Sequence, residues 1–523
     1  MGYALNPAER KVYTGRKEAD SGMRKVIRTL IVLMVLAACC TLPALAAEAR
    51  YGDAAVEAEG FSRPDRLCDG NRLSYAGADG PASVTVSREG GIAALYLEFD
   101  RIPQPWTLTD PATGRSLSCG SNGFLHEYVD VSALGEPLPA QVVLTFDQGT
   151  SIGEIHTFSE GTLPDWVQRW EPPCEQADLL LISSHSDDEQ LFFAGVLPYY
   201  AVERQLNVQV AYVVQHFEAN GAADHQRPHE QLDGLWTVGV RHYPVMSRFP
   251  DLYAKSSDRE AALSQALAVY ERAGYTYEDF VNYLIWCIRR FQPLVVVSHD
   301  LDGEYGHGTH VLCADALGAA LTGAADPAQS PDTAEEFGPW QVEKTYLHLY
   351  PENPIVMDWD TPLERLGGKT PFQVTQEGFA CHKSQHWTWF YRWIYGTDSR
   401  PIQKAADITS YSPCLYGLYD TQVGPDRVGG DFFENVQTYA QRAQAEAERL
   451  AEEERLARER AEAERQAQLA AQAEAERLAR EQQAARRRLW IGLAAGGLAA
   501  IVCVILTAGL VRRRKKRRSG RTR

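Results

Sequence analysis

The folded part of this sequence lacks an excess of basic residues. The chain carries 52 Lys and Arg against 69 Asp and Glu, a formal net charge of −17. Nine of the basic residues lie in the last twelve positions, 512–523, which hold no acid. A nucleic-acid-binding surface needs basic side chains to neutralise phosphates. The composition therefore argues against a nucleic-acid partner, and the acidic remainder would also repel a long anionic polymer.

A cysteine framework is also missing. Of the ten cysteines, Cys39, Cys40 and Cys503 fall in apolar terminal segments, and the other seven are an odd number with wide spacing. No Cys-x-x-Cys pair or Cys/His finger spacing occurs, which argues against a thiolate zinc site. Cys68 and Cys119 lie in one predicted β-domain and could form a single disulfide, so their pairing is left open.

Extended disorder is not expected for most of the chain. Apolar residues make up 45% of the 523 positions, with 11 Trp, 24 Tyr and 17 Phe. Such a composition can bury more than one hydrophobic core. At about 100–200 residues per domain, we expect about two or three domains.

The N-terminal region, residues 1–46, resembles a secretory signal. Basic residues precede the apolar run 29–38, and small residues follow it. Met23 is then the favoured start, and an unusually long leading segment is the other option. A short match to a bacterial lipoprotein cleavage box ends at Cys39, so lipidation there is a second-ranked alternative.

The C-terminal region has the features of a membrane anchor. Residues 489–511 contain no charge, and at about 1.5 Å per residue they reach roughly 34 Å, enough to span a bilayer. The basic tail 512–523 should remain cytoplasmic by the positive-inside rule. The sequence therefore predicts a single-pass cell-membrane protein whose bulk is extracytoplasmic.

A helical stalk is predicted directly before this anchor. Residues 435–488 are almost entirely Ala, Glu, Arg, Gln and Leu, which favour helix. Pairs such as Glu454 with Arg458 stand at the stabilising i, i+4 spacing. The leucines keep no regular heptad, so a solvated single helix and a loose, self-associating coiled coil both fit.

Residues 47–172 show the pattern of an all-β domain. Short alternating runs, such as 82–86 and 141–146, are separated by clusters of turn-forming residues. This pattern predicts a β-sandwich. A carbohydrate-binding module and a plain spacer both remain open as its role.

Residues 173–434 change to an alternation of strands and helices. Continuous apolar runs such as 179–182 and 294–297 are typical of parallel strands covered on both faces. Segments 260–272 and 277–290 have the apolar spacing of amphipathic helices. We therefore predict an α/β domain with a doubly wound, mostly parallel, Rossmann-like sheet.

Polar clusters follow two of these predicted strands, where such sheets place their ligands. His185 and Asp188 follow the first strand, and His310 lies in the cluster after the second. Three N/O ligands leave a coordination position for water, as in catalytic metal sites. We expect Zn²⁺, although two histidines and one carboxylate also suit Fe²⁺. Asp187, beside the ligand carboxylate, is placed to take a proton from that water.

A structural interpretation of the first cluster competes with this one. His185 and Asp188 could cap a helix that starts near Asp188, because Asp is common at helix N-termini. Two such clusters, each directly after an apolar strand, make the metal site the stronger hypothesis.

These segments resemble the PIG-L/LmbE-like zinc-dependent N-acetylglucosaminyl deacetylases. Residues 184–189 match the family motif A-H-P-D-D-E, and residues 303–310 match G-x-Y-G-H-x-x-H. The resemblance covers about half the chain and none of the β-domain, stalk or anchor.

The resemblance implies roles for the matched residues. His185, Asp188 and His310 would ligate zinc, and Asp187 would act as the general base. Tyr305 and His307 would lie near the substrate carbonyl, to stabilise the oxyanion or protonate the leaving amine.

Two further matches suggest substrate-binding residues. Arg227 resembles the substrate-facing arginine of the family, and a surface ion pair is the alternative. His382, in a segment similar to the late motif H-x-S-Q, would line the substrate site, and a packed loop histidine is the alternative.

Two departures from the family pattern bear on the chemistry. Ser186 replaces the usual proline between ligand and base, which removes no reactive group. Thr309 stands where many members have Asp or Asn to orient His307. A threonine hydroxyl can hold an imidazole nitrogen but cannot offset an imidazolium charge, which leaves the role of His307 open.

These observations lead to one principal functional hypothesis and two alternatives. We expect a membrane-anchored, extracytoplasmic, metal-dependent hydrolase that removes an N-acetyl group from an N-acetylglucosamine-type sugar, glycan or glycolipid. The first alternative is a non-catalytic cell-surface glycan-binding protein with a vestigial deacetylase domain. The second is a metal hydrolase of another amide bond.

Overall fold

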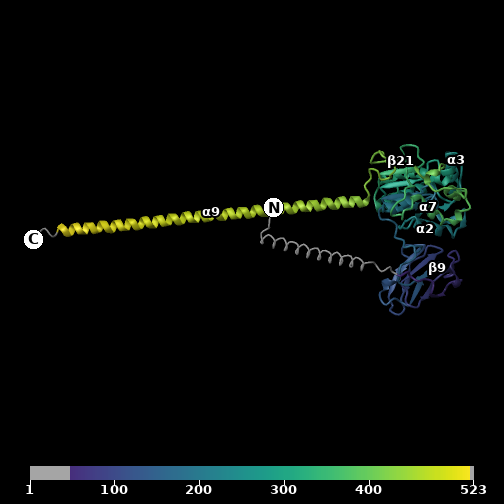
Figure 1. Cartoon of the computed structure of the whole chain (residues 1–523), viewed down its shortest axis with the longest axis horizontal. Helices are drawn as coiled ribbons and strands as arrows, with labels where there is room; N and C mark the ends of the chain where they lie inside the picture. The colour runs from purple at the N-terminus through teal and green to yellow at the C-terminus, as the bar shows by residue number, and fades with distance from the viewer. Residues whose placement is uncertain (1–46, 519–523) are drawn as a thin grey trace, which may run out of the picture. The chain divides into compact units, whose positions relative to one another are not determined.

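The computed structural model describes residues 47–518 (Figure 1). The chain divides into two compact units, Met1–Thr438 and Tyr439–Arg523. The predicted signal region 1–46, with the proposed start at Met23 and the alternative lipidation at Cys39, lies outside the described residues.

The first part of the larger unit contains two antiparallel sheets. One has the order β1-β3-β8-β5-β6 and the other the order β2-β9-β4-β7. Buried and half-buried residues alternate along β3, as expected for a strand with one face in a core. The rings of Phe99 in one sheet and Trp106 in the other lie 6.5 Å apart, so side chains of the two sheets meet. The strand bounds are β1 Ala55–Glu59, β2 Ala76–Ala78, β3 Ala82–Ser87, β4 Ala94–Phe99, β5 Trp106–Thr109, β6 Ser116–Cys119, β7 His126–Asp130, β8 Gln141–Phe146 and β9 Thr150–Phe158.

The two cysteines of this region are not joined. Cys68 and Cys119 are both free thiols. The Cys68 thiol donates a hydrogen bond to the carbonyl of Ile155 in β9, whereas Cys119 ends β6 at the edge of the other sheet. The possible disulfide between them, left open by the sequence, is therefore not formed in this structure.

A seven-stranded sheet forms the centre of the second part. Its order is β14-β11-β10-β16-β17-β21-β18. Strands β14, β11, β10, β16 and β17 run parallel, and β21 is antiparallel to β17 and β18. The chain runs outward from β10 to β14 and then returns to place β16 on the other side of β10. The bounds are β10 Leu179–Ser183, β11 Val208–Tyr212, β14 Val245–Met246, β16 Val295–Ser298, β17 Lys344–His348, β18 Pro354–Val356 and β21 Leu415–Thr421.

Helices supply most of the remaining core. Helix α4 begins with a capping box in which the Thr276 and Asp279 side chains each accept from the other residue's backbone N–H. Its apolar face contributes Leu284 and Ile288 to a core that also holds Leu180 of β10. The helices predicted at 260–272 and 277–290 are confirmed as α3 and α4. The helix bounds are α2 Arg227–Thr237, α3 Arg259–Arg272, α4 Tyr277–Phe291, α5 Gly308–Ala325, α6 Pro331–Phe337, α7 Pro371–Phe379 and α8 Phe390–Tyr395.

The segment after β10 does not start a regular helix at Asp188. Turns occupy residues 186–195, two helical residues follow, and a π-helix, η3, covers Pro198–Glu203. The helix-capping interpretation of His185 and Asp188 therefore fails. The Asp188 carboxylate does accept the backbone N–H of His185 at 2.8 Å, but this bond closes a turn.

Smaller pieces complete this unit. A three-stranded sheet has the order β13-β12-β15, and a two-stranded sheet joins β19 and β20. The bounds are β12 Gln215–Ala219, β13 Ala222–Ala223, β15 Pro250–Asp251, β19 Gly396–Thr397 and β20 Arg400–Pro401, with short 3-10 turns η1 Pro64–Arg66, η2 Val131–Leu134, η4 Glu304–Gly306, η5 Lys383–Gln385 and η6 Ala405–Asp407.

A buried polar network joins the β region to helix α2. The Arg72 guanidinium donates to Glu98 at 2.8 Å and forms an ion pair with Asp233 of α2. The rings of His126 in β7 and His229 in α2 approach with 2.7 Å between Nε2 and Nδ1. Charge-assisted hydrogen bonds and a contact between two imidazoles thus hold helix α2 against the β region.

The described part of the second unit is one continuous helix, α9 Tyr439–Arg518. It begins four residues later than the predicted stalk. Arg449 pairs with Glu446 at 2.6 Å and with Glu453 at 2.5 Å along its exposed surface. The apolar run 489–511 lies within this helix, which is long and apolar enough to cross a membrane. The coarser prediction of an α/β domain followed by an apolar C-terminal helix agrees with these elements.

Candidate metal centre and active site

Adjacent parallel strands bring the three predicted metal ligands together. Because β10 pairs with β16, the segments after these strands leave the same edge of the sheet. His185 and Asp188 follow β10, and His310 lies in the first turn of α5. His185 Nδ1 lies 3.2 Å from Asp188 Oδ2 and 3.1 Å from His310 Nε2, and the latter two atoms are 3.3 Å apart. The three atoms form a nearly equilateral triangle.

This triangle has the dimensions of a metal-binding set. Tetrahedral coordination at about 2.0–2.1 Å separates neighbouring ligand atoms by about 3.3–3.4 Å. All three side chains are buried, at 5% exposure or less. Two imidazoles and one carboxylate fit Zn²⁺ and leave a position for water or substrate.

His299 also lies near this set, but its nitrogens are engaged elsewhere. Its Nε2 is 3.5 Å from Asp188 Oδ2, and it accepts the backbone N–H of Ser184 at 2.9 Å. Its Nδ1 is 2.8 Å from a carboxylate oxygen of Glu304. With both ring nitrogens in hydrogen bonds, His299 is a poorer ligand than His310.

Glu304 organises three histidines beneath the site. Its carboxylate lies 2.7 Å from His310 Nδ1, 2.8 Å from His299 Nδ1 and 2.7 Å from His348 Nδ1. Burial would raise the pKa of Glu304, but the contacts with His299, His310 and His348 hold it well below its usual value. A carboxylate that accepts from Nδ1–H leaves the Nε2 lone pair of His310 directed at Asp188, the arrangement of a supported metal ligand.

Asp187 occupies a strained position beside the triangle. Its φ of 110° is unfavourable for a residue with a Cβ, and its backbone N–H donates to Glu189 at 2.9 Å. Burial raises the pKa of the Asp187 carboxyl to about 7, an effect that Arg227 opposes and Asp188 reinforces. The side chain is buried at 3% exposure and adjoins the ligand carboxylate.

Tyr305 and His307 lie next to the histidines of the triangle. The Tyr305 ring is 5.5 Å from both His307 and His310, and His307 is 4.7 Å from His185. Burial lowers the pKa of His307 well below its usual value, and the nearby His185 and His310 lower it further. The His307 Nδ1 atom is buried without a hydrogen-bond partner.

Thr309 does not orient His307. Its hydroxyl donates to the carbonyl of Leu252 at 3.4 Å instead. The hydrogen bond considered for this hydroxyl is therefore not formed. Ser186 likewise removes no reactive group, and its backbone N–H donates to His216 Nε2 at 2.8 Å.

Arg227 is engaged with acidic groups of the site. It opens helix α2, and its Nη1 donates to Asp251 Oδ2 at 2.8 Å. Its Nη2 donates to the carbonyl of Ser186 at 3.1 Å and lies 3.4 Å from Asp187 Oδ1. The guanidinium thus braces the turn that carries the proposed base, and the ion pair is buried instead of at the surface.

His382 lies deeper than a substrate-lining residue would. Its side chain is fully buried, and its Nε2 is 3.5 Å from Glu189 Oε1. Glu189 in turn accepts the backbone N–H of Asp187. This placement fits a residue that supports the Asp187 turn better than one that touches a sugar.

Sequence reasoning missed three contributors to the site. Asp251 of β15 lies 3.4 Å from His185 Nε2, and His216 of β12 accepts from Ser186. No local motif marks either residue, because both come from the small β13-β12-β15 sheet. Glu304 lies inside a recognised motif, so its position could have been singled out but its three histidine partners could not.

The comparisons with known proteins concern the part of the chain that carries this site. Residues 180–321 match the family model PIG-L, GlcNAc-PI de-N-acetylase. The 1D-myo-inositol 2-acetamido-2-deoxy-alpha-D-glucopyranoside deacetylase 2 of Saccharopolyspora erythraea is 29% identical over 214 residues, 38% of this chain and 73% of that protein. The corresponding deacetylase of Geodermatophilus obscurus is 26% identical over 213 residues, 37% of this chain and 68% of that protein.

Among solved structures, N,N'-diacetylchitobiose deacetylase from Pyrococcus horikoshii matches with a TM-score of 0.31 and 16% identity. The match covers 43% of this chain and 79% of that one. The family model and the named relatives support placing residues 180–321 among the PIG-L/LmbE-like N-deacetylases.

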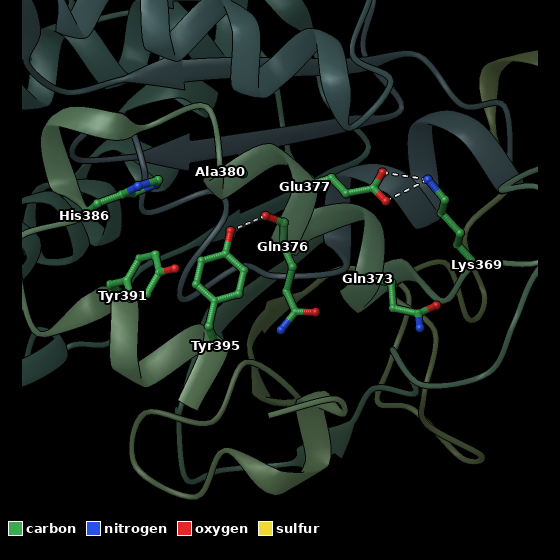
Figure 2. Close-up of a pocket in the computed structure, with 8 residues that line it drawn as sticks. All are labelled: Lys369, Gln373, Gln376, Glu377, Ala380, His386, Tyr391 and Tyr395. Carbon is green, nitrogen blue, oxygen red and sulfur yellow. Dashed lines mark hydrogen bonds and ion pairs between the residues drawn. The ribbon is translucent and has the colours of Figure 1, made fainter. Parts of the chain in front are cut away.

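A separate cavity is lined by other residues of this unit (Figure 2). It has a volume of about 490 Å³ and is lined by Lys369, Gln373, Gln376, Glu377, Ala380, His386, Tyr391 and Tyr395. Its polar groups are largely paired with one another: Lys369 with Glu377 at 2.7 Å, and the Tyr395 hydroxyl with the carbonyl of Gln376 at 2.5 Å. None of the predicted site residues lines it.

Proposed function

We propose that this protein is a membrane-anchored, extracytoplasmic, metal-dependent N-deacetylase that hydrolyses the acetamide of an N-acetylglucosamine-type sugar or glycoconjugate. The observation that carries this proposal is the triangle of His185, Asp188 and His310 donor atoms, with Asp187 beside it. The names of the curated relatives support the amino-sugar substrate, because both act on a 2-acetamido-2-deoxy-glucopyranoside.

His185, Asp188 and His310 are the proposed ligands of one divalent ion, expected to be zinc, with Fe²⁺ also compatible. Such an ion supplies Lewis-acid polarisation of the acetamide carbonyl and lowers the pKa of a bound water. Glu304 keeps the His310 ring in the tautomer that presents Nε2.

Asp187 is the proposed general base. Its carboxylate accepts a proton from the attacking water as the water oxygen bonds to the acetamide carbon. The Tyr305 hydroxyl donates a hydrogen bond to the carbonyl oxygen as negative charge develops there. The proton on Asp187 then passes to the sugar nitrogen, with His307 placed beside the substrate carbonyl to hydrogen-bond the oxyanion, and the C–N bond breaks to give acetate and a free amine.

Arg227 and His382 are the remaining proposed site residues, and both act near the general base, Asp187. Arg227 lies between the Asp187 and Asp251 carboxylates and is placed to meet a substrate oxygen from there. His382 acts through Glu189, which holds the backbone of Asp187. We therefore assign His382 a positioning role.

The proposed location follows from helix α9 and its flanks. The apolar run 489–511 would cross the membrane, the basic residues from 512 onward would stay cytoplasmic, and residues 47–434 would be extracytoplasmic. The segment 439–488 would act as the stalk, either single or self-associated. The two antiparallel sheets would form a β-sandwich module and the seven-stranded sheet a doubly wound domain.

Metal analysis and acetate release test the proposal together. Full-length protein in detergent should carry about one divalent ion per chain and release acetate from N-acetylglucosamine conjugates. Asp187→Asn should abolish release while the metal content stays unchanged, and the exposed Asp302→Asn on the neighbouring loop is the matched control. Equal release by Asp187→Asn would contradict the assignment. Glycan binding without metal or acetate would instead favour the non-catalytic alternative.

A further inference from the structure

Residues 386–395 form an unusually aromatic segment. Six of these ten residues are Trp, Tyr or Phe, against 10% in the whole chain. Three of the rings are exposed: Trp387 at 86%, Trp389 at 44% and Tyr391 at 42%. A cluster of exposed aromatic side chains is costly in water and commonly marks a binding surface.

The inner end of this segment reaches the proposed active site. The Trp389 ring lies 5.6 Å from Tyr305 and 6.4 Å from Tyr411, and Tyr305 also lies 6.4 Å from Tyr411. Tyr305 in turn contacts His307 at 5.5 Å. A continuous row of rings therefore leads from the candidate metal centre to the surface at Trp389.

A further exposed ring stands beside the same histidine. Tyr253 is 59% exposed, and its ring lies 5.4 Å from His307. Lys255 places its ammonium 5.0 Å from the centre of the Tyr305 ring. The residues around Tyr305 and His307 thus present several aromatic faces and a single lysine.

A surface of aromatic rings with one lysine favours an uncharged sugar over a polyanion as its ligand. The faces of pyranose rings carry axial C–H groups that pack on aromatic rings, while Trp N–H and Tyr O–H groups can bond sugar hydroxyls. A polyanion would need several cations here, and the anionic body of the protein would repel it. An uncharged sugar chain fits the surface on both counts.

We propose that Trp389 and Trp387 form an outer sugar subsite, which binds the unit next to the N-acetylated sugar held between Tyr305 and Tyr253. This inference rests on the proposed deacetylase function and narrows its substrate class to uncharged glycans of two or more units. Trp389 meets the adjoining sugar, and Trp387, two residues away and 86% exposed, offers a second ring.

Tyr391 supplies a matched control on the same segment. It is exposed to nearly the same extent as Trp389 but lines the separate cavity with His386 and Tyr395 (Figure 2). Its removal deletes a comparable exposed ring without touching the row that leads to Tyr305.

The experiment compares substrate length across full-length variants. Wild-type protein should cleave N-acetylglucosamine tri- and tetrasaccharides with higher kcat/KM than the monosaccharide. Trp389→Ala should reduce that preference by about 3- to 10-fold, chiefly through KM, and Trp387→Ala should reduce it less. Trp389→Phe should restore part of the preference, and Tyr391→Ala should keep the wild-type ratio. Metal content and melting temperature identify any variant that has simply lost its fold.

Binding separates failure of the subsite from failure of the proposed function. In the Asp187→Asn background, tetrasaccharide should quench tryptophan fluorescence, and Trp389→Ala should weaken that binding. If binding follows this pattern but no acetate appears with any substrate, the subsite stands and the proposed catalysis fails. An unchanged length preference and unchanged binding in Trp389→Ala would overturn the subsite. So would Trp387-dependent binding to neutral phosphatidylcholine vesicles without any effect of sugar chains, which would indicate a lipid-facing surface.

Discussion

Glu304 Oε2 and His310 Nδ1 lie 2.7 Å apart, and this contact determines which nitrogen of His310 faces Asp188. The same carboxylate also meets His299 and His348. One buried side chain therefore sets the orientation of a proposed metal ligand and of two rings packed around it.

Replacement of Glu304 should weaken metal binding without removing any ligand. Glu304→Gln keeps the side-chain volume but removes the charge that stabilises the Nδ1–H tautomers. We expect metal affinity to fall by about 10- to 100-fold, as measured by competition with a chromogenic chelator. The exposed Asp302→Asn should have wild-type affinity. An unaltered affinity in Glu304→Gln would remove the proposed supporting role.

Gly306 should not tolerate a side chain. Its φ is 71°, and an added Cβ would lie 2.0 Å from the carbonyl oxygen of Ser256. Gly306→Ala combines a positive-φ penalty of about 1 kcal/mol with a backbone clash, so we expect a loss of about 2–4 kcal/mol in unfolding free energy. The control is Gly338→Ala, with a φ of 81° and open space around the Cβ, which should lose only about 1 kcal/mol. Denaturant unfolding measures both, and equal losses would show that the Ser256 contact yields easily.

Arg72 should be a principal link between the β region and helix α2. Arg72→Ala leaves the partly buried carboxylates of Glu98 and Asp233 without their cation. We expect a loss of about 3 kcal/mol, near the low end for a broken buried pair. The exposed pair of Arg248 with Asp279 offers the control, since Arg248→Ala should cost about 0–1 kcal/mol. Similar unfolding free energies for the two variants would contradict this assignment.

Acid should weaken the same junction. Burial would raise the pKa of Glu98, but His156, His126 and Arg72 together hold it below the ordinary value of 4.5. A depressed folded-state pKa stabilises the fold fully above pH 4.5, and this stabilisation is lost as pH falls further. Burial lowers the pKa of His126 from 6.5, which also makes the fold less stable as pH falls below that value.

Urea unfolding at several pH values measures this effect. The free energy of unfolding should decline from about pH 6.5 downward and more steeply below pH 4.5. Glu98→Gln should flatten the lower part of the curve, whereas the decline that starts near pH 6.5 should remain, because loss of the Glu98 charge lowers the pKa of His126 further. A wild-type slope in Glu98→Gln would show that other carboxylates dominate acid unfolding.

Local sequence patterns were enough to predict several elements. The apolar run at 179–182 lies in β10, and the runs at 82–86 and 141–146 lie in β3 and β8. Strand periodicity, amphipathic helix spacing and capping residues depend on a few neighbouring positions. They can therefore be recognised in the sequence alone. The His and Asp motifs were legible for the same reason, because each occupies one short segment after a strand.

The contacts that support the site could not be predicted from local sequence patterns. Asp251 lies 63 residues beyond Asp188 in the sequence, and nothing around it distinguishes it from other loop acids until β15 pairs with β12. Glu304 has histidine partners from two strand ends and one helix. The free thiols of Cys68 and Cys119 likewise follow from tertiary contacts, because Cys68 bonds to β9 of one sheet and Cys119 ends β6 of the other.

The sequence by itself determined the identity of the reactive groups, the chain order of the β and α/β regions, and the long helix with its apolar segment. Only the tertiary structure decided that three donor atoms meet within about 3.3 Å, that Glu304 and Asp251 brace them, and that Trp389 adjoins Tyr305. The physical reason is that secondary-structure preferences are local, whereas a metal site, a buried ion pair and an aromatic surface need atoms from distant segments. Packing of the sheets and helices brings those segments together.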